Sequence, residues 1–566
     1  MNNRNIAYFT MEVGIDPDMP TYSGGLGVLA GDTLKSCADM GIPTVGITLL
    51  NRKGYFYQRI NKDGYQIEEE NHWSVDDFME LQENEVVVHI EGREVKVKAW
   101  KYVYKGNEDK EIPIFFLDTD VDGNSEWDRR LTDYLYPGDK WYRLCQEIIL
   151  GVGGVRMLES LGYSNIKKYH MNEGHAAFLT FELLREEIKK NNLELEEALK
   201  RVREKCVFTT HTPVPAGHDK FPLEFVEKAL GDYLIDEISH LYMHNNEFNM
   251  TLLALNLSKY VNGVAGKHKE ISKKMFPGYQ IHSITNGVHS VTWTSPPFKN
   301  LFDKYIPGWR KDPFTLRNAL RISTKEIWDA HIDAKKTLLH YVNREENCGM
   351  DKDIFTIGFA RRMTAYKRAE LLFSDLERLK DIARRRGRIQ IILSGKAHRD
   401  DTQGKEIIHH LIKIRDELNA EDNGIEVAYL ENYDIHVALY LVAGVDVWLN
   451  TPLRPMEASG TSGMKACHNG VPHFSVLDGW WLEGHVEGVT GWSIGKYPEG
   501  DEIEKPSDSV YDAQDLYNKL DNVLMPLYYN DKEKWAEVMR NAIAFNASFF
   551  NTTRMLQQYV TNAYFI

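Results

Sequence analysis

The stretch IFTIGFA at residues 354–360 is an almost uninterrupted run of apolar and small side chains, too short for a typical helix. Such a run predicts a strand that is buried on both faces, as in a parallel sheet. After it, Leu372, Leu376 and Leu379 recur at helical spacing, and a second apolar run, IQIIL, follows at residues 389–393. Strand, loop, helix and strand in this order predict a parallel sheet with right-handed crossovers, of the Rossmann type.

The same alternation extends along the chain in both directions. A helix is expected around Ile407, Leu411 and Ile414, and further strands are expected at residues 427–430 and 445–450. In the N-terminal half, the expected strands are Ile6–Phe9, Thr44–Leu49, 167–170 and Cys206–Thr209. We therefore expect an α/β protein with two Rossmann-like domains facing a central cleft, where ligands bind beyond the carboxyl ends of the strands.

The chain length suggests the number of domains, and the net charge argues against some classes of binding partner. The 566 residues suggest two or three domains. The 68 Lys and Arg against 83 Asp and Glu give a net charge of −15, which argues against nucleic acid or a membrane as the main partner. A neutral polysaccharide stays open, and the 12 Trp and 29 Tyr suit sugar binding, although most such rings fill cores.

Cysteine usage and hydropathy indicate the compartment. The five cysteines form no CxxC pair, which argues against a disulfide framework or a zinc site and favours a reducing compartment. The chain contains neither a long apolar segment nor the usual form of a signal peptide, so the expected location is the cytoplasm. We expect no metal site. DTDVDGN, from Asp118, begins like an EF-hand, but its closing position is Arg129 instead of Glu.

Two loops are candidates for binding an anion. Gly24, Gly25, Leu26 and Gly27 precede a helix expected from near Val28, and glycines let the backbone approach a ligand closely. A glycine turn required only for packing is the equal alternative.

The second candidate follows the strand at residues 354–360. Arg361, Arg362 and Lys367 there place three cations at the mouth of the sheet. An ordinary solvated surface is the equal alternative.

RPMEASGTSGMKACHNG at residues 454–470 carries the strongest signal. Ser459, Thr461 and Ser462 are residue types that favour a helix N-cap, so a helix is expected from near Thr461, with Gly470 as its terminating glycine. Backbone N–H groups near Thr461 would then face a phosphate, with Lys465 about one turn inside the helix.

Lys465 could pair with such an anion, or form an imine with an aldehyde cofactor whose phosphate fills the same loop. Burial near Arg362 and Lys367 would lower the pKa of Lys465, which favours the neutral amine that an imine needs. The alternative is an ordinary surface lysine, which the small neighbouring residues disfavour.

With these loops in view, the chain resembles the α-glucan phosphorylases that act on glycogen, starch or maltodextrin, especially the shorter prokaryotic forms. The resemblance runs through most of the chain in matching order. Its motifs are SGGLG at Ser23, FTTHT at Phe208, YVNGVAGKHKEISKK at Tyr260, ITNGVH at Ile284, RRMTAYKR at Arg361, SGKA at Ser394, YLENYD at Tyr429, EASGTSGMK at Glu457 and LDGWWLEG at Leu477.

The resemblance implies a GT-B-like fold and a glycosyltransferase. It implies an N-terminal domain at residues 1–288, a cofactor-binding domain at 289–545, and a C-terminal helix within 546–566 that packs back on the N-terminal domain. The implied reaction is reversible, retaining phosphorolysis of an α-1,4-glucan by inorganic phosphate, which gives α-glucose 1-phosphate. The implied cofactor is pyridoxal 5′-phosphate, whose phosphate takes part in proton transfer to substrate phosphate, and the implied assembly is a homodimer.

Residue by residue, the match suggests a complete site. Lys465 corresponds to the lysine that carries the cofactor, and Arg362 and Lys367 to the residues that hold substrate phosphate. His211 corresponds to a histidine whose main-chain carbonyl faces the reacting sugar carbon. The positions around the cofactor phosphate are Thr461, Ser462, Gly25, Lys367 and Tyr433. The positions around the substrate are Gly24, Leu26, His175, Asn286, Tyr366, Glu457, Ala458, Ser459 and Gly460.

Some positions depart from the animal members of the family. Asp434 stands where those enzymes have Arg, which removes one cation near the phosphates, and Gly14 stands where an aromatic residue contacts the cofactor. Ser462 and Gly463 replace a Gly-Asn pair. The chain begins at the first catalytic strand, so we expect no N-terminal extension carrying a phosphorylation site.

Three rival functions stay under consideration. A nucleotide-sugar glucan synthase of the same fold often has a second acid eight positions after the first, but here that position (457 + 8) is Lys465. A glycoside hydrolase needs two carboxylates around one bond, and only Glu457 lies in an evident catalytic loop. A silent glucan-binding protein would not need Lys465 or the cations. Trp480 and Trp481 suit either an acceptor-sugar platform or plain packing.

Overall fold

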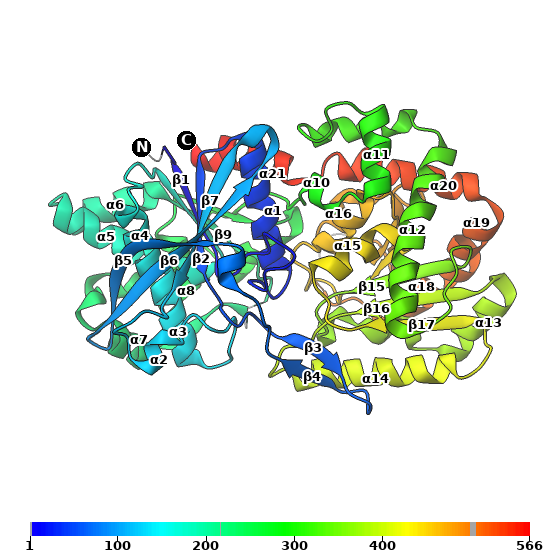
Figure 1. Ribbon diagram of the computed structural model, residues 1–566, viewed down its shortest axis with the longest axis horizontal. Coiled ribbons are helices and arrows are strands. Elements are labelled where there is room, and N and C mark those ends of the chain that lie inside the picture. Colours follow the sequence, from blue (N-terminus) through cyan, green and yellow to red (C-terminus); the bar gives the residue numbers. More distant parts are fainter. Residues whose placement is uncertain (1–2, 215–216, 499–504, 566) are drawn as a thin grey trace.

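The computed structural model describes residues 3–214, 217–498 and 505–565. The chain forms two α/β halves that lie side by side, the N-terminal half in blue to green and the C-terminal half in green to orange (Figure 1). Helices cover both faces of the main sheet in each half. No helix among the described residues is long and apolar enough to cross a membrane.

Within the described residues, the N-terminal half is built on a nine-stranded sheet. Its strands, in spatial order, are β14 (His282–Ser283), β13 (Tyr260–Gly263), β9 (Cys206–Thr209), β8 (Lys168–Asn172), β1 (Ile6–Phe9), β2 (Thr44–Leu49), β7 (Glu111–Asp118), β6 (Arg93–Lys105) and β5 (Glu80–Ile90). The strands from β14 to β7 are parallel, whereas β6 and β5 form an antiparallel edge. The predicted N-terminal strands are confirmed, with the one at 167–170 shifted by one residue at its start.

The C-terminal half is built on a six-stranded sheet, counted over the residues that the structure describes, in which every pair is parallel. The spatial order is β17 (Ile425–Leu430), β16 (Ile389–Ser394), β15 (Phe355–Ala360), β18 (Val447–Asn450), β19 (His473–Val476) and β20 (Gly491–Ile494). The predicted strands at 354–360, 389–393 and 427–430 are confirmed to within two residues, and the strand expected at 445–450 begins at Val447. The order of strands reverses between β15 and β18, which opens a crevice beyond their carboxyl ends.

The helices follow the predicted alternation. In the N-terminal half the longer ones are α1 (Gly25–Met40), α3 (Lys140–Ile148), α4 (Gly154–Ser160), α5 (Leu179–Lys190), α6 (Leu195–Lys205), α7 (Leu223–Leu230), α8 (Met250–Asn256) and α9 (Gly266–Met275). In the C-terminal half they are α11 (Pro296–Tyr305), α12 (Thr324–Glu346), α13 (Leu376–Arg386), α14 (Thr402–Asn419), α15 (Ile435–Gly444), α16 (Thr461–Cys467), α18 (Ser509–Lys519), α19 (Met525–Asn530) and α20 (Lys532–Asn541).

Both faces of the N-terminal sheet are buried, which explains its apolar strands. Ala7 and Phe9 of β1 pack into the core on one face, and Ile6 and Tyr8 pack into the core on the other. This split follows from the period of two along a strand. A strand buried on both sides reads as a continuous apolar run, as it does here.

A glycine follows one of these helices in an unusual conformation. Helix α13 ends at Arg386, and the Gly387 that follows it has φ 130° and ψ 162°, outside the left-handed helical region typical of a terminating glycine. The ring of Tyr529 lies so close that a Cβ at Gly387 would be 2.6 Å from it. Packing against Tyr529 therefore accounts for the glycine.

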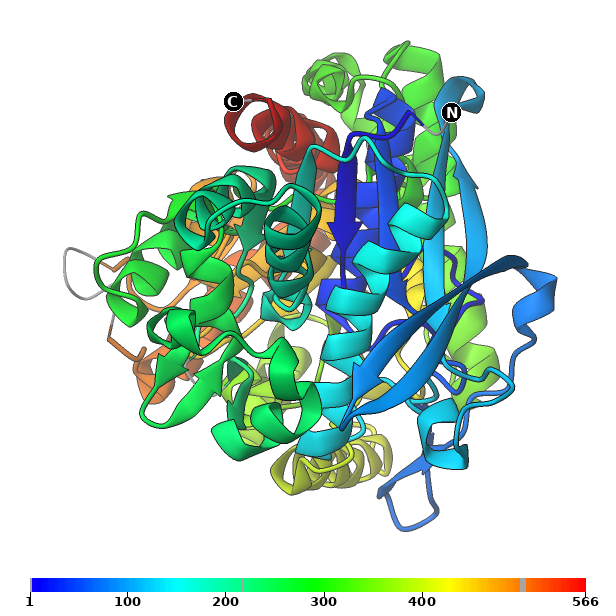
Figure 2. The ribbon, with the colours of Figure 1, turned by 90° about the vertical axis from the view of Figure 1, so that its left-hand side faces the viewer.

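The end of the chain returns to the N-terminal half. Helix α21 (Thr552–Tyr559) packs against α1, and Met555, Leu556 and Tyr559 share a core with Ile6. Figures 1 and 2 show this red segment beside the blue strands.

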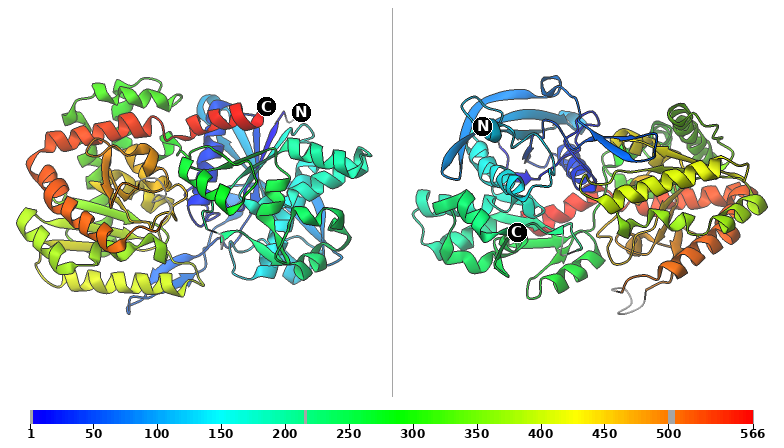
Figure 3. Two further views of the ribbon diagram at one scale, coloured as in Figure 1. Left: turned by 180° about the vertical axis from the view of Figure 1, so that it is seen from behind. Right: turned by 90° about the horizontal axis from the view of Figure 1, so that it is seen from below.

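A hairpin of the N-terminal half reaches over to the C-terminal half. Its strands are β3 (Tyr57–Ile60) and β4 (Gln66–Glu69), and Figure 3 shows it alongside α14. The buried side chain of Gln58 donates to the carbonyl of Gly395 (2.8 Å) and accepts from the backbone N–H of Asn432 (2.9 Å). These bonds tie the loops after β16 and β17 to the N-terminal half.

A buried ion cluster joins α12 to the C-terminal sheet. Asp446, just before β18, accepts from Lys335 Nζ (2.5 Å), from His331 Nε2 (2.8 Å) and from the backbone N–H of Thr356 (2.7 Å). The side chains of Asp446, Lys335 and His331 are fully buried. Burial alone would raise the pKa of Asp446, but Lys335 and His331 hold it below its usual value.

Removing one member of this cluster should therefore be costly. We predict that Asp446→Ala lowers the free energy of unfolding by about 3–5 kcal/mol, because it leaves the ammonium of Lys335 buried without its partner. Urea unfolding followed by tryptophan fluorescence measures this loss. The control is Asp333→Ala on helix α12, which also carries Lys335. This change breaks an exposed ion pair with Lys336 and should cost no more than about 1 kcal/mol. Equal unfolding midpoints for the two variants would contradict the prediction.

Candidate active site

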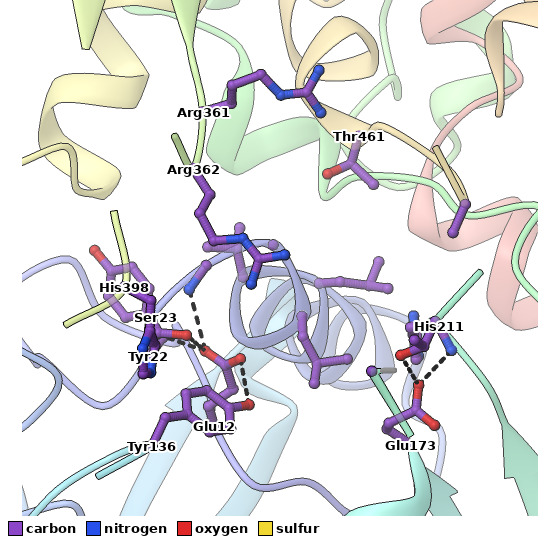
Figure 4. A pocket seen from close by; sticks show the side chains of 18 of the residues that line it. Glu12, Tyr22, Ser23, Tyr136, Glu173, His211, Arg361, Arg362, His398 and Thr461 are labelled. Carbon is purple, nitrogen blue, oxygen red and sulfur yellow. Dashed lines mark hydrogen bonds between the residues drawn. The ribbon is translucent and has the colours of Figure 1, made fainter. Parts of the chain in front are cut away.

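A cavity of about 920 Å³ lies between the two halves, at the carboxyl ends of the strands of both sheets. In each sheet, the loops that line the cavity follow the two neighbouring strands between which the strand order reverses. Glu12 and Glu173 follow the adjacent strands β1 and β8, while Arg361 and Glu457 follow the adjacent strands β15 and β18. Figure 4 shows Glu12 and Glu173 on one side of the cavity and Arg361 on the other, with Arg362 extending into the space between them.

The predicted site residues come together in this one cavity. Its lining includes Gly24, Gly25, Leu26, His175, His211, Asn286, Arg362, Tyr366, Lys367, Tyr433, Glu457, Ala458, Ser459, Gly460, Thr461, Ser462 and Lys465. Residues far apart in the chain, such as Gly24 and Lys465, thus share a single surface.

Lys465 lies on α16 with its amine removed from water. The side chain is only 6% exposed, and Nζ lies 3.9 Å from the centre of the Trp293 ring. Burial lowers the pKa of Lys465 from its ordinary 10.5 to about 8, with Asp32 acting in the opposite direction. A neutral amine is therefore accessible near physiological pH. Trp293 follows no strand and belongs to no glycine-rich loop, so it was missed at the sequence level.

Helix α16 begins at Thr461 as predicted, but its N-cap is not a side chain. Gly460 occupies that position in the left-handed region, with φ 80° and ψ 64°, where glycine is favoured. The helix ends at Cys467, before Gly470, which has φ 68° in the turn that follows. The hydroxyl of Ser462 accepts from the indole N–H of Trp448 (3.1 Å), so its own hydrogen can be donated to a ligand.

The cations of the loop after β15 have different surroundings. Glu457 Oε2 accepts from Arg361 Nη2 (2.5 Å) and from Lys367 Nζ (2.8 Å). Burial alone would raise the pKa of Glu457, but these two cations hold it at about 2. Arg362 instead extends into the cavity, where Nη2 lies 3.5 Å from the hydroxyl of Tyr366. Arg362 is thus presented to an anionic ligand.

The glycine-rich turn starts α1 earlier than expected. The helix begins at Gly25 instead of near Val28, with Gly24 as its N-cap. A Cβ at Gly24 or Gly25 would meet nothing within 4 Å, so the backbone there is open to a ligand. A Cβ at Gly27, in contrast, would lie 2.7 Å from Glu12 Oε2, so that glycine is required by packing. Both interpretations of the turn therefore apply, at different residues.

Glu12 anchors this turn and was missed at the sequence level. Its Oε2 accepts from the backbone N–H of Ser23 (2.6 Å) and Gly24 (3.3 Å), and its Oε1 accepts from the hydroxyl of Tyr136 (2.9 Å) (Figure 4). Its position directly after a predicted strand is a signal that could have found it.

His211 is held as a neutral ring. Its backbone N–H donates to Glu173 Oε2 (2.7 Å), as Figure 4 shows, and its Nε2 lies 2.6 Å from Asn172 Oδ1. Burial lowers the pKa of His211 to about 4, so the ring is neutral at physiological pH, and Nε2 donates because the amide oxygen can only accept. Glu173 itself has φ 77°, a strained conformation at the end of β8.

Several buried polar atoms around the cavity have no hydrogen-bond partner within the described structure. Those on cavity-lining residues include His175 Nδ1, His218 Nε2, Asn286 Oδ1 and Ser459 Oγ. The opposite nitrogen of His175, Nε2, lies 3.2 Å from Asp219 Oδ2. Unpaired buried groups of this kind are costly, and a ligand rich in hydroxyl groups would pair with them.

The departures from the animal enzymes have local explanations. Asp434 caps α15, because its Oδ1 accepts from the backbone N–H of Val437 (2.9 Å). Lys396, from the loop after β16, lines the same side of the cavity and brings another cation. Beside Gly14, the ring of Tyr22 occupies the space, 3.3 Å from where a Cβ would lie.

Two sequence-level interpretations need correction. Trp480 and Trp481 are 1% and 0% exposed, so packing is right and a sugar platform is wrong. Glu457 is not the only carboxylate in a catalytic loop, since Glu12 and Glu173 also line the cavity.

The EF-hand resemblance has a local explanation too. Asp120 of that loop pairs with Arg129 (2.6 Å). In the part of the chain that the structure describes, no group of three or more His, Cys, Asp or Glu could hold a metal.

Comparison with known proteins gives a consistent result. The family model of carbohydrate phosphorylases matches residues 10–132 and 231–525, which leaves His175 and His211 outside the matched segments. The chain is 41% identical to maltodextrin phosphorylase of Thermococcus litoralis, with 99% of this chain and 70% of the relative covered. It is 37% identical to glycogen phosphorylase of Aquifex aeolicus (99% and 86% covered) and 35% identical to that of Mycobacterium tuberculosis (99% and 70%).

Proposed function

This chain belongs to the carbohydrate phosphorylase family, and we propose that it cleaves α-1,4-glucans such as glycogen, starch or maltodextrin with inorganic phosphate. The product is α-glucose 1-phosphate, and the reaction is reversible. One observation carries the proposal: a buried lysine of lowered pKa, an arginine open to an anion, and unpaired polar atoms suited to sugar hydroxyls line the same cavity.

The residues around Lys465 fit pyridoxal 5′-phosphate. The neutral amine accessible at Lys465 suits attachment of an aldehyde, and the indole of Trp293 offers an aromatic face beside it. The groups that would hold the cofactor phosphate are the hydroxyls of Thr461 and Ser462, the amine of Lys367 and the backbone at Gly25, with Tyr433 nearby. When bound, the cofactor would supply a phosphate that exchanges a proton with the substrate phosphate.

Arg362 and Lys367 would bind the attacking phosphate. Both are cations at the end of β15, and each would make a charge-assisted contact to a dianion. Glu457 holds Lys367 in place by their hydrogen bond of 2.8 Å. Preorganised cations of this kind stabilise charge without rearranging during the reaction.

The glucosyl unit would lie among groups from both halves. Asn286 and His175 of the N-terminal half and Ser459 of the C-terminal half offer unpaired polar atoms to its hydroxyls. Leu26, Tyr366, Ala458 and Gly460 would complete this lining, and the carbonyl of His211 would face the reacting carbon.

The engagement of the carboxylates supports retention. Glu12 accepts from the backbone of the glycine turn, Glu173 accepts from the backbone of His211, and Glu457 is ion-paired. None of these three is free to serve as a nucleophile or to activate water, as a glycoside hydrolase requires. The synthase alternative is not favoured, because Lys465 occupies the position of its second acid and the relatives are named as phosphorylases.

The fold proposal follows the same lines. We infer a GT-B-like arrangement of two Rossmann-like domains, residues 1–288 and 289–545, with 546–566 returning to the first. The strand order of the C-terminal sheet, β17-β16-β15-β18-β19-β20, supports this, as does the packing of α21 on α1. Five free cysteines suit a cytoplasmic location. A homodimer is proposed from the resemblance alone.

We predict that the cofactor is attached to Lys465. The purified protein should absorb as a lysine-bound pyridoxal phosphate, and borohydride followed by peptide mapping should place the label on the peptide containing Lys465. Lys465→Ala should abolish the label, whereas Lys396→Ala, which removes another lysine of the cavity, should retain it. Pyridoxal without its phosphate should attach yet support little turnover. Label on a different lysine, or full activity without the cofactor, would refute the assignment.

We also predict that Arg362→Ala and Lys367→Ala weaken phosphate use. Each removes a charge-assisted contact, which should cost about 2–4 kcal/mol, or on the order of 30- to 1,000-fold in kcat/KM for phosphate. Initial rates at varied phosphate measure this. Arg384→Ala is the control, since Arg384 is exposed and bonds to the carbonyl of Lys380 in its own helix. If both cavity variants matched Arg384→Ala, the phosphate site would lie elsewhere.

A further inference from the structure

A short helix packs between α1 and α16, the two helices on either side of the proposed cofactor site. Helix α10 (Ser290–Trp293) lies between α1 and α16 (Figure 1). On the α16 side, His468 Nε2 lies 2.9 Å from the hydroxyl of Ser290, and the side-chain amide of Asn469 donates to the carbonyl of Trp293 (2.8 Å). The backbone of Trp293 is thus fixed relative to Lys465.

On the α1 side, a buried carboxylate holds the Trp293 side chain. The indole Nε1 donates to Asp32 Oδ2 (2.7 Å), while the face of the same indole carries Lys465 Nζ at 3.9 Å. Asp32 and Trp293 are each 1% exposed, and Lys465 is 6% exposed. A carboxylate, an indole and an amine therefore follow one another across the boundary between the two halves.

We propose that Asp32 is a positioning residue for Lys465 and acts through Trp293. A hydrogen bond to a carboxylate is short and directional, so it fixes the plane of the indole. A fixed indole face then attracts the ammonium form of Lys465 through its ring electrons, an interaction that is strongest away from water. This inference rests on the proposed function, in which Lys465 carries the cofactor.

Asp32 also supplies the counter-charge of the buried amine. Burial lowers the pKa of Lys465, Asp32 raises it, and Lys35, one turn further along α1, lowers it. Without Asp32, Lys465 would face Lys35 with no carboxylate between the two helices. Other titratable side chains on the elements around Lys465 include Asp39 of α1, His289, Asp434, His436, Lys367, Glu457, His468 and His473.

Attachment of the cofactor requires the neutral amine. The lone pair of Nζ attacks the aldehyde carbon, a carbon–nitrogen double bond forms, and the carbonyl oxygen leaves as water with two hydrogens from nitrogen. An ammonium has no lone pair for this attack. When the site is saturated with cofactor, the pH at which attachment becomes half-complete therefore shifts with the pKa of Lys465.

The test is Asp32→Asn, which removes the charge and keeps an oxygen that can accept from Trp293. Full-length protein freed of cofactor is incubated with pyridoxal 5′-phosphate at a series of pH values and reduced with borohydride. Mass spectrometry then gives the fraction labelled at Lys465. Because loss of Asp32 lowers the pKa of Lys465, the midpoint should move to lower pH by roughly one unit. An unchanged midpoint would overturn the role of the charge.

Asp39→Asn is the matched control on the same helix. Asp39 accepts from His289 Nε2 (2.8 Å) and from the backbone of Asn107 (2.7 Å), so the change also removes a half-buried charge from α1. It should leave the midpoint at the wild-type pH. An equal shift in both variants would mean that any disturbance of α1 has this effect, and the proposal would fail.

Trp293→Phe separates orientation from charge. It keeps an aromatic ring beside Lys465 but removes the N–H that Asp32 holds. The midpoint should stay at the wild-type pH, while the affinity for pyridoxal 5′-phosphate should fall about tenfold because the ring is no longer fixed. Unchanged affinity would overturn the positioning role, even if Asp32→Asn does not fold. Absence of label on Lys465 in the wild-type protein would instead refute the proposed function.

Discussion

Removal of one lysine amine from water is the constraint on which the site depends. An ammonium is costly to bury, so the cavity has to offer Lys465 partial compensation while leaving its proton easily lost. Neither half achieves this alone, because the lysine belongs to α16 and the carboxylate that moderates its charge belongs to α1. The cavity therefore works only when the two sheets are held face to face, which the hairpin bonds through Gln58 and the return of α21 both favour.

The acidic side chains of the cavity are engaged in contacts within the protein, whereas Arg362 is open to a ligand. Carboxylates that could attack a sugar are engaged by backbone N–H groups or cations, as Glu12, Glu173 and Glu457 show. Arg362, in contrast, extends into open space toward the opposite wall (Figure 4). An active site with neutralised acids and a presented cation is suited to binding phosphate and unsuited to hydrolysis, since hydrolysis needs a free acid and base pair.

The strands could be predicted well from the sequence, because a strand buried on both faces has an unbroken run of apolar residues, such as residues 354–360. The sequence predicted cap details poorly: the cap of α16 is Gly460 and not a side chain, since the turn needs a positive φ that serine and threonine disfavour. Glu12 and Lys396 could have been found, because each lies shortly after a strand. Asp32 and Trp293 could not, because they lie inside helices and only the packing of distant segments brings them to Lys465.

The most direct measurement of the central claim is proton NMR of the first-formed product when the protein is given maltodextrin and inorganic phosphate, with and without added pyridoxal 5′-phosphate. The account predicts α-glucose 1-phosphate, formed only when both phosphate and the cofactor are present. Free glucose, the β anomer of the phosphate ester, or equal turnover by protein stripped of cofactor would contradict it.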